Sequence, residues 1–470
     1  MIPAGTRVHF IGIGGAGMSA IASVLMARGH AVSGSDLRES EVTRRLRAAG
    51  ARIEIGHAAE HLQPAQLVVT SRAVPEQNIE VQTARRRGVR ILHRAEMLAE
   101  LMQGTRSIGV VGTHGKTTTT SMIARILERA GRDPTVLIGG EVDDFGGNAR
   151  TGRGRELVAE VDESDGSLLQ AIPDIAVVTS VEATDHLDFY GSANRLTDTF
   201  RRFLHRLPEN GFAILCADTP AGRWLAGQGR GTVITYGLEA GAVYTARVQE
   251  MVGTRSRFQA WRGDDALGEV SLGIPGAYNI QNALGALAVT LEIGVPFASA
   301  AESLAGFSGV LRRFTVRGQI DGVLIVDDYA HNPTKVRALL QATRHCWPRA
   351  RIIAVFQPHR YSRTHTVGGQ FAQVFDAADE VIITALYAAD EPPIPGVDAG
   401  IIVRAVSAHR SVQFIEEASK VVDALEQRVR PGDLVLTIGA GDIWKIGDAL
   451  VSRLRARAAE GPGREVPQRG

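Results

Sequence analysis

The chain has 470 residues, with 52 Lys or Arg against 51 Asp or Glu, so its formal net charge is +1. That balance argues against partners held by long-range charge attraction, such as nucleic acid or an anionic membrane. The two cysteines, Cys216 and Cys346, form no CxxC pair, which argues against a disulfide framework and a cysteine zinc site. We find no signal-peptide pattern and no apolar run long enough to span a bilayer, which favours a cytoplasmic protein.

At roughly 150 residues per domain, we expect about three domains. In the first third, the sequence predicts strands at 8–13 and 67–71 and helices at 18–28 and 94–102. Such alternation indicates a parallel sheet with helices on its faces. A first domain would therefore end near residue 105.

The second domain is predicted to begin with a strand at 107–111 and to continue to residue 311. Further strands are expected at 157–161, 175–178 and 212–215, then a small antiparallel region between 231 and 273, and a helix at 279–293. In the third domain, 312–457, the predicted strands are 323–326, 352–356, 380–384 and 434–438. The tail 458–470 is rich in Gly, Pro, Arg and Glu and is predicted to be disordered.

A glycine-rich turn, Gly12-Ile13-Gly14-Gly15-Ala16-Gly17, follows the first predicted strand, and Asp36 lies where a ribose-binding acid would stand. Taken alone, the pattern favours an NAD-dependent dehydrogenase, although a tight packing turn between strand and helix would look similar. The diphosphate of a UDP-sugar could use the same backbone N–H groups and helix end.

A second loop, Gly112-Thr113-His114-Gly115-Lys116-Thr117-Thr118, lies between a predicted strand and a predicted helix. Glycines let backbone N–H groups point at phosphate oxygens, and the helix end adds partial positive charge. Lys116 would reach the β- and γ-phosphates, and the Thr117 hydroxyl would bind Mg²⁺. A strict P-loop would have Gly where this chain has Val110, but the Gly-Lys-Thr core remains and predicts nucleotide binding.

Acidic residues follow the strand predicted at 157–161. Glu160 inside an apolar strand would cost several kcal/mol unless it is paired or bound to a metal, so we expect it to bind Mg²⁺. Asp162, Glu163 and Asp165 are expected, at least in part, to be solvated loop residues. His186 follows a strand end, where α/β sheets place ligands, and is either a metal ligand or an ordinary loop histidine.

Together these motifs resemble those of the Mur ligases, which build the peptide stem of peptidoglycan. Residues 112–117 are similar to the ATP loop of that family, and residues 12–19 to the UDP-binding loop of its alanine-adding branch. Segments 327–334, 356–364 and 439–443 also fit, so the resemblance runs from about residue 8 to about residue 454.

Three departures from the family pattern stand out. The segment from Glu182 to His186 is one residue longer than usual, Tyr278 replaces a frequent histidine, and the His-His-Pro variant appears as His331-Asn332-Pro333. Sister ligases have a carbamylated lysine soon after the His186 region. Here no lysine occurs between His186 and Asn210, which fits the alanine-adding branch.

The resemblance implies a three-domain α/β architecture. It comprises an N-terminal Rossmann-like domain for the UDP substrate, a central P-loop-type ATPase domain, and a C-terminal Rossmann-like α/β domain for ATP and the amino acid. The implied enzyme activates the lactyl carboxylate of UDP-N-acetylmuramate as an acyl phosphate and joins it to L-alanine, releasing ADP and phosphate. ATP and Mg²⁺ are the implied cofactors, and we expect a monomer or weak homodimer.

The resemblance also assigns site residues by position. The implied catalytic residues are Lys116, His186, Arg313 and Asp328. The implied ATP contacts are Gly112, Thr113, His114, Gly115, Lys116, Thr117, Thr118, Asn279, Asn282, Arg313, Asp328 and His331. The implied substrate contacts are Gly14, Gly15, Ala16, Gly17, Met18, Ser19, Asp36, Ser71, Arg72, His359, Arg360 and Arg363. The implied metal ligands are Thr117, Glu160 and His186.

Three alternatives remain open from the sequence. A recycling ligase would add a whole tripeptide to the same sugar nucleotide, but its glycine loop lacks the continuation Gly17-Met18-Ser19. A dehydrogenase leaves Lys116 and Glu160 unexplained. A non-enzymatic nucleotide switch would bind ATP without turnover that depends on sugar nucleotide and amino acid.

Overall fold

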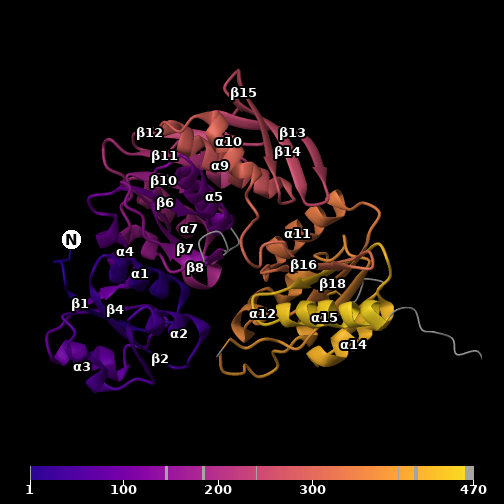
Figure 1. Cartoon of the computed structure of the whole chain (residues 1–470), viewed down its shortest axis with the longest axis horizontal. Helices are drawn as coiled ribbons and strands as arrows, with labels where there is room; N and C mark the ends of the chain where they lie inside the picture. Colours follow the sequence, from indigo (N-terminus) through magenta and orange to yellow (C-terminus); the bar gives the residue numbers. More distant parts are fainter. Residues whose placement is uncertain are drawn as a thin grey trace, which may run out of the picture. The chain divides into compact units, whose positions relative to one another are not determined.

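The computed structural model describes residues 2–142, 147–182, 186–239, 241–389, 391–406 and 411–460. The chain forms two compact units; most of the first is coloured from indigo to rose and most of the second from orange to yellow in Figure 1. Unit 1 comprises Met1–Gln249, Arg257–Leu272 and Tyr278–Val310, and unit 2 comprises Glu250–Ser256, Gly273–Ala277 and Leu311–Gly470.

Unit 1 begins with a five-stranded parallel sheet of order β3-β2-β1-β4-β5. Its strands are β1 (Arg7–Ile11), β2 (Ala31–Asp36), β3 (Arg52–Ile55), β4 (Leu67–Thr70) and β5 (Arg90–His93). Its helices are α1 (Ala16–Ala27), α2 (Glu41–Ala48), η1 (Ala59–Leu62), α3 (Ile79–Arg86) and α4 (Arg94–Met102). The strand order reverses at β1, between β2 and β4, and the glycine turn lies at that switch point, where α/β sheets bind ligands.

A ten-stranded sheet completes unit 1, in the order β15-β14-β13-β12-β11-β10-β6-β9-β7-β8. The strands are β6 (Arg106–Val111), β7 (Thr135–Val142), β8 (Gly147–Arg150), β9 (Glu156–Glu160), β10 (Ile175–Val178), β11 (Phe212–Cys216), β12 (Thr232–Gly237), β13 (Tyr244–Val252), β14 (Arg255–Arg262) and β15 (Asp265–Leu272). The helices are α5 (Lys116–Arg129), η3 (Ser167–Gln170), α6 (Leu187–Tyr190), α7 (Ala193–Leu204), α8 (Pro220–Ala226), α9 (Ala277–Glu292) and α10 (Phe297–Ala305).

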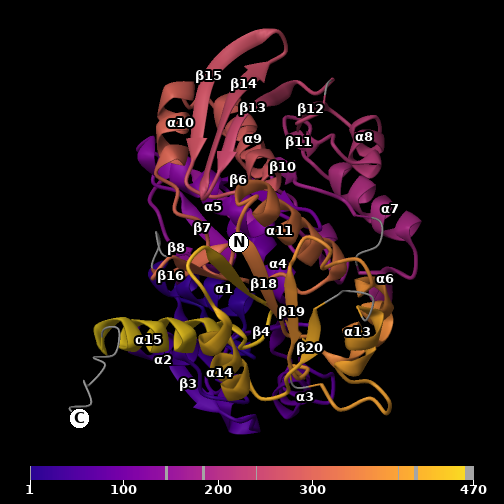
Figure 2. The ribbon, with the colours of Figure 1, turned by 90° about the vertical axis from the view of Figure 1, so that its right-hand side faces the viewer.

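The predicted antiparallel region between 231 and 273 is wrong at its start. β12 pairs in parallel with β11, because α8 carries the chain back across the sheet between them, and β13 pairs in parallel with β12. β13, β14 and β15 then lie side by side at the end of the same sheet, as Figure 2 shows. Helix α1 of the first sheet lies against β7 and β8 of the second, so unit 1 is one packed body.

Unit 2 contains a six-stranded sheet of order β16-β17-β21-β18-β19-β20, parallel except for the β16–β17 pair. The strands are β16 (Thr315–Ile320), β17 (Val323–Asp328), β18 (Arg351–Phe356), β19 (Glu380–Ile383), β20 (Val412–Phe414) and β21 (Asp433–Ile438). The helices are α11 (Pro333–Cys346), α12 (Tyr361–Val367), η4 (Gly368–Phe371), α13 (Gly400–Ala405), α14 (Ala418–Arg428) and α15 (Trp444–Glu460).

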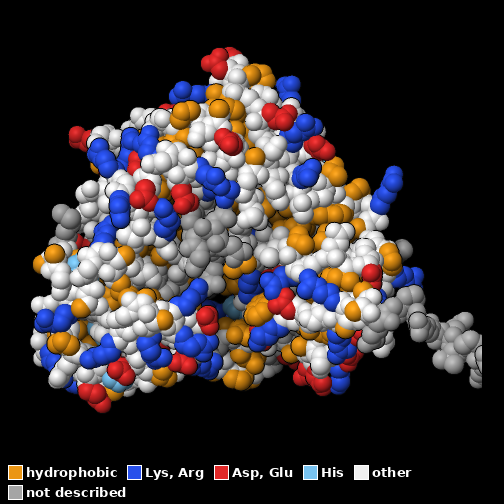
Figure 3. Space-filling model, viewed as in Figure 1, with side chains coloured by type: hydrophobic (Ala, Val, Ile, Leu, Met, Phe, Trp, Pro, Cys, Tyr) orange, Lys and Arg blue, Asp and Glu red, His pale blue; other side chains and the backbone are white. Residues whose placement is uncertain are grey.

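The strands and helices predicted in the sequence are otherwise confirmed, with ends that move by one or two residues. Helix α15 continues to Glu460, so residues 458–460 of the predicted tail are helical, and 461–470 lie outside the described residues. Among the described residues, no helix has the length and apolar character needed to cross a membrane. Figure 3 shows Lys and Arg interspersed with Asp and Glu over the visible face, as the balanced composition predicts.

Both cysteines are buried and free. Cys216 ends β11 in the core of unit 1, and Cys346 ends α11 in unit 2. Burial raises the pKa of the Cys216 thiol to about 12, and it also raises the pKa of Cys346. Their thiols are therefore protonated near neutral pH.

Candidate functional site

The loop after β6 is shaped by two glycines with positive φ. Gly112 has a φ of +132° and Gly115 of +81°, and both angles favour glycine. A Cβ on Gly115 would lie 2.3 Å from Oδ1 of Asn282, so the amide of α9 packs directly on the loop. Asn282 in turn donates to Oδ1 of Asn279 at 3.3 Å. The predicted ATP residues of the loop and of α9 thus come together.

Residues at the end of β10 hold the middle of the loop. The Thr113 N–H donates to the Ser180 carbonyl and the His114 N–H to the Ser180 hydroxyl, both at 2.9 Å. The His114 imidazole contacts the Glu182 carboxylate. Thr118 is buried in the first turn of α5. The strand end that the sequence singled out therefore supports the loop.

Lys116, the first residue of α5, points into the acidic turn, residues 160–165 at the end of β9. Its Nζ donates to the Gly112 carbonyl at 2.6 Å and to Oε1 of Glu163 at 2.8 Å. Burial alone would lower the pKa of the Lys116 ammonium, but the carboxylates of Glu163, Glu160 and Asp162 outweigh it and raise that pKa. The lysine is therefore a fixed positive charge at the carboxyl end of β6.

Glu163 is a site residue that the sequence did not identify. Part of the cluster of Asp162, Glu163 and Asp165 was expected to be solvated, yet the Glu163 side chain is fully buried. Besides Lys116, its Oε1 lies 3.1 Å from Nε2 of His186, and the Tyr190 hydroxyl donates to its backbone carbonyl. The available signal was its place just after a buried strand, at the sheet edge that also carries the lysine.

Two of the predicted metal ligands converge. Oε2 of Glu160, at the end of β9, accepts hydrogen bonds from the Thr117 hydroxyl at 3.0 Å and from the Gly139 N–H at 2.9 Å. His186 lies instead beside Glu163 and has a positive φ of +55°. Within the described ranges, no group of three or more His, Cys, Asp or Glu side chains has the geometry to hold a metal ion. Residues 183–185, where the extra residue falls, lie outside those ranges.

The glycine turn after β1 leads into α1. Gly14 donates its N–H to Oδ2 of Asp36 at 2.8 Å, so Asp36 fixes the turn that it was predicted to accompany. Gly15 is the N-cap of α1 and makes no side-chain cap. The Met18 side chain is buried in the core, which leaves its backbone for any ligand contact, and the Ser19 hydroxyl donates to the Ala16 carbonyl.

The second predicted loop of this domain follows β4. Ser71 lies directly after the strand, at the same switch point as the glycine turn. The Arg72 guanidinium lies 4.4 Å from the centroid of the Phe189 ring, in α6. Since α6 begins just after His186, this contact connects the loop after β4 to the part of unit 1 that contains the ten-stranded sheet.

In unit 2, Asp328 organises the turn before β16. Its carboxylate accepts the backbone N–H groups of Phe314 and Ala330, both at 2.8 Å. Burial raises the pKa of Asp328, although the nearby Arg313 charge opposes that shift. The Arg313 guanidinium lies 5.2 Å from the Tyr329 ring centroid. The two predicted residues therefore lie close together.

The predicted histidines and arginines of unit 2 form one cluster at the carboxyl ends of β17 and β18. His331 and His359 have ring centroids 5.8 Å apart, and Nδ1 of His359 lies 3.0 Å from Nη1 of Arg363. Burial and the neighbouring arginines lower the pKa of His359 to about 4, and burial lowers that of His331 well below its usual value. Both imidazoles are neutral at neutral pH.

Tyr387 is a second residue that the sequence missed. Its ring stacks on His359 with a centroid distance of 5.8 Å and an interplanar angle of 6°. Its carbonyl accepts the N–H of Arg360, whose φ is +69°. The Glu391 carboxylate accepts a hydrogen bond from the Ser362 N–H and lies 3.8 Å from the Arg360 guanidinium. This loop fixes the backbone from which the predicted arginines project.

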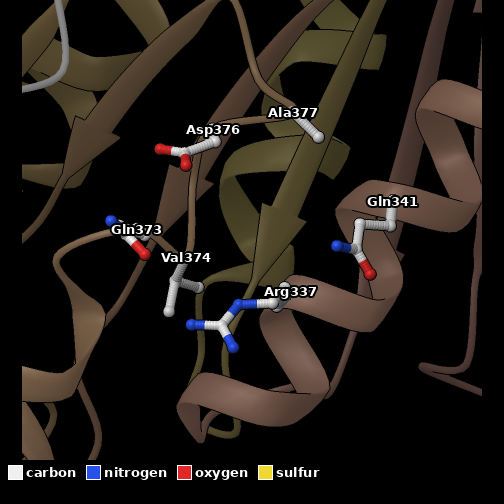
Figure 4. Close-up of a pocket in the computed structure, with 6 residues that line it drawn as sticks. All are labelled: Arg337, Gln341, Gln373, Val374, Asp376 and Ala377. Carbon is white, nitrogen blue, oxygen red and sulfur yellow. The ribbon is translucent and has the colours of Figure 1, made fainter.

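A separate hollow in unit 2 lies between α11 and the segment after η4. Its lining residues are Arg337, Gln341, Gln373, Val374, Asp376 and Ala377, shown in Figure 4. None of the predicted site residues lines it. The predicted site residues therefore lie elsewhere in the structure.

Models of one family match three successive parts of the chain. They are the Mur ligase family catalytic domain at 7–106, the Mur ligase middle domain at 110–290, and the Mur ligase glutamate ligase domain at 312–441. The UDP-N-acetylmuramate–L-alanine ligase of Trichlorobacter lovleyi is 48% identical over 451 residues, covering 95% of this chain and 99% of that protein.

Solved structures agree with these matches. A UDP-N-acetylmuramate–alanine ligase from Thermotoga maritima superposes with a TM-score of 0.82 at 30% identity, covering 96% of this chain and 99% of that one. A murein peptide ligase from Psychrobacter arcticus has a TM-score of 0.70 at 26% identity, with the same coverage.

Proposed function

The chain belongs to the Mur ligase family, and we propose that it joins L-alanine to the lactyl carboxylate of UDP-N-acetylmuramate while ATP is cleaved to ADP and phosphate. The observation that carries the proposal is the constellation of Lys116, Thr117 and Glu160 at the end of β6 and β9, on a chain matched along almost its whole length by a ligase of that name. The domains that we propose are 1–105, 106–311 and 312–457.

ATP is bound by the middle domain of this family, and we place its phosphates on the loop 112–118, with Lys116 at the β- and γ-phosphates. The Thr117 hydroxyl and the Glu160 carboxylate fit Mg²⁺, because both are hard oxygen ligands and this ion completes its shell with phosphates and waters. When bound, the ion would neutralise charge on the transferring phosphoryl group. His186 would serve a second ion or position the first, from its place beside Glu163.

The remaining predicted residues divide between the substrates. The turn from Gly14 to Ser19 and the start of α1 would hold the diphosphate, with Asp36, Ser71 and Arg72 on the uridine side. Asn279 and Asn282 would contact ATP beside its loop. From unit 2, Arg313, Asp328 and His331 would serve ATP, and His359, Arg360 and Arg363 would bind the substrate and amino-acid carboxylates.

The chemistry follows from these positions. The lactyl carboxylate attacks the γ-phosphorus in line, the bond to the β-phosphate oxygen breaks, ADP leaves and an acyl phosphate forms, while Lys116 stabilises the charge that spreads over the phosphoryl oxygens. The alanine amine then attacks the acyl carbon, and phosphate leaves. The amine proton must pass to a base, and a nearby histidine or carboxylate would take it.

The test is phosphate release from ATP with UDP-N-acetylmuramate and L-alanine both present, and with each omitted. We expect turnover only with both. Faster turnover with the tripeptide in place of alanine would favour the recycling ligase, although the 48% identity to an alanine ligase argues for alanine. ATP binding without turnover would favour a nucleotide switch, and NADH binding would favour a dehydrogenase.

A further inference from the structure

Arg94, the first residue of α4, touches two loops that belong to different sheets of unit 1. A Cβ on Gly17 would lie 2.7 Å from Nη1 and 3.0 Å from Cδ of Arg94, so the guanidinium lies against the first turn of α1. Its Nη2 donates to Oδ2 of Asp162 at 3.0 Å. The Arg94 side chain is 21% exposed and that of Asp162 is 37% exposed. One cation therefore contacts both the glycine turn and the acidic turn.

Asp162 lies within the acidic turn that surrounds Lys116. It follows Glu160 by two residues and precedes Glu163, and its Oδ1 accepts the Ser164 N–H at 3.0 Å. Any shift of Arg94 therefore acts on the backbone that carries Glu160 and Glu163.

The N-terminus of α1 lies at the glycine turn, beside Arg94. Gly15 provides no side-chain cap and no acidic residue lies in the first turn, so the helix end keeps its partial positive charge. Asn148 of β8 ties this turn to the second sheet by donating to the Ala16 carbonyl at 2.7 Å and to the Ser19 hydroxyl at 2.9 Å. The turn, Arg94 and Asp162 are thus held as one assembly.

We propose that Arg94 is a positioning residue that couples the sugar-nucleotide site to the ATP site. This inference rests on the proposed function, in which the diphosphate binds at the glycine turn. A guanidinium carries a fork of N–H donors, so Arg94 can keep Asp162 and donate to the diphosphate at the same time. The diphosphate then fixes Arg94, Arg94 fixes the acidic turn, and Glu160 and Glu163 are held ready for ATP. By linkage, ATP must tighten binding of the sugar nucleotide by the same factor.

Calorimetry measures this coupling. UDP-N-acetylmuramate and a non-hydrolysable ATP analogue with Mg²⁺ are titrated separately and then each in the presence of the other. We expect each ligand to raise the affinity of the other about fivefold or more in the wild-type protein. Arg94→Gln should reduce that factor to about one. In steady-state assays the same variant should raise KM for both nucleotides and change kcat much less.

A charge swap separates coupling from a merely structural ion pair. Arg94→Asp combined with Asp162→Arg keeps an ion pair between the two loops but presents a carboxylate to the diphosphate. We expect the swap to recover thermal stability and not the coupling. Arg90→Gln is the matched control, because Arg90, in β5, pairs at 3.1 Å with Glu100 of α4 and its side chain is 58% exposed. The control should keep wild-type coupling.

Three results would overturn the inference while leaving the proposed function intact: a wild-type coupling factor of one, unchanged coupling in Arg94→Gln, or full recovery of coupling in the charge swap. A wild-type protein that binds no UDP-N-acetylmuramate would instead refute the proposed function, and the inference with it. Loss of coupling in Arg94→Gln without recovery in the swap would support Arg94 in the proposed role.

Discussion

Substituting Lys116 with alanine changes stability and catalysis together, and the structure gives a size for each effect. The substitution leaves Glu163, whose side chain is fully buried, without the cation that lies 2.8 Å away. Breaking a buried ion pair by removing one partner costs about 3–5 kcal/mol. Because the Lys116 side chain is 15% exposed, we expect the lower end, about 3 kcal/mol, in the free energy of unfolding.

The catalytic effect should be separable from that loss. Removing one fixed charge at the transferring phosphoryl group typically lowers kcat by ~10²–10³-fold. A double variant, Lys116→Met with Glu163→Gln, removes both charges and keeps similar volumes. We expect it to recover stability to within about 1–2 kcal/mol of wild type while turnover stays lost.

Urea unfolding followed by circular dichroism gives the stabilities, and phosphate release gives the turnover. Lys420→Ala is the matched control, since Lys420 pairs with Glu417 in a solvated i,i+3 pair and should change stability by less than about 1 kcal/mol. If Lys116→Ala were as stable as wild type, the ion pair would not support the acidic turn. If the double variant turned over at the wild-type rate, Lys116 would have no role at the phosphate.

Further predictions concern the loop, the metal and pH. Gly115→Ala should weaken ATP binding by about tenfold or more, because the new Cβ would meet Asn282. Gly131→Ala is its control, because Gly131 has a similar φ of +73° and open space around it. That control should lose about 1 kcal/mol of stability and no ATP affinity. Glu160→Gln should raise the Mg²⁺ concentration for half-maximal turnover by about 10–100-fold, and an unchanged midpoint would contradict the metal assignment. His359 has a pKa of about 4 in the folded chain against an ordinary 6.5, so its contribution to stability is complete above pH 6.5 and is lost as pH falls toward 4. Urea unfolding at pH 7 and pH 4.5 gives the free energy of unfolding at each pH. The drop between the two should be smaller in His359→Gln than in the wild type, by at most about 3 kcal/mol. Equal drops would count against a neutral buried imidazole at His359.

The sequence predicts best what is decided locally. The phosphate loop could be identified because glycines, a lysine and a helix start follow one strand, and the structure forms a loop of that kind with a positive φ at Gly115. Glu163 could not be identified in this way, because its burial arises only when β9, α5 and α6 meet. Tyr387 was missed for the same reason, since its loop reaches His359 across the sheet edge.

Topology beyond neighbouring residues was predicted less well. Short strand-like runs with several glycines predicted a small antiparallel region between 231 and 273, yet β12 pairs in parallel with both β11 and β13. The choice depended on α8, a short helix whose pattern is weak in the sequence. Similarly, the role of Asp328 as an acceptor of two backbone N–H groups appears only once β16 and β17 are paired.

The two buried, protonated thiols give the molecule a practical property. A maleimide dye needs an accessible thiolate, so folded protein should react slowly at Cys216 and Cys346. A single cysteine engineered onto the surface would then label selectively, with little background from the native pair. Denatured molecules would expose both native thiols, so the same reagent would count the unfolded fraction during heating or storage.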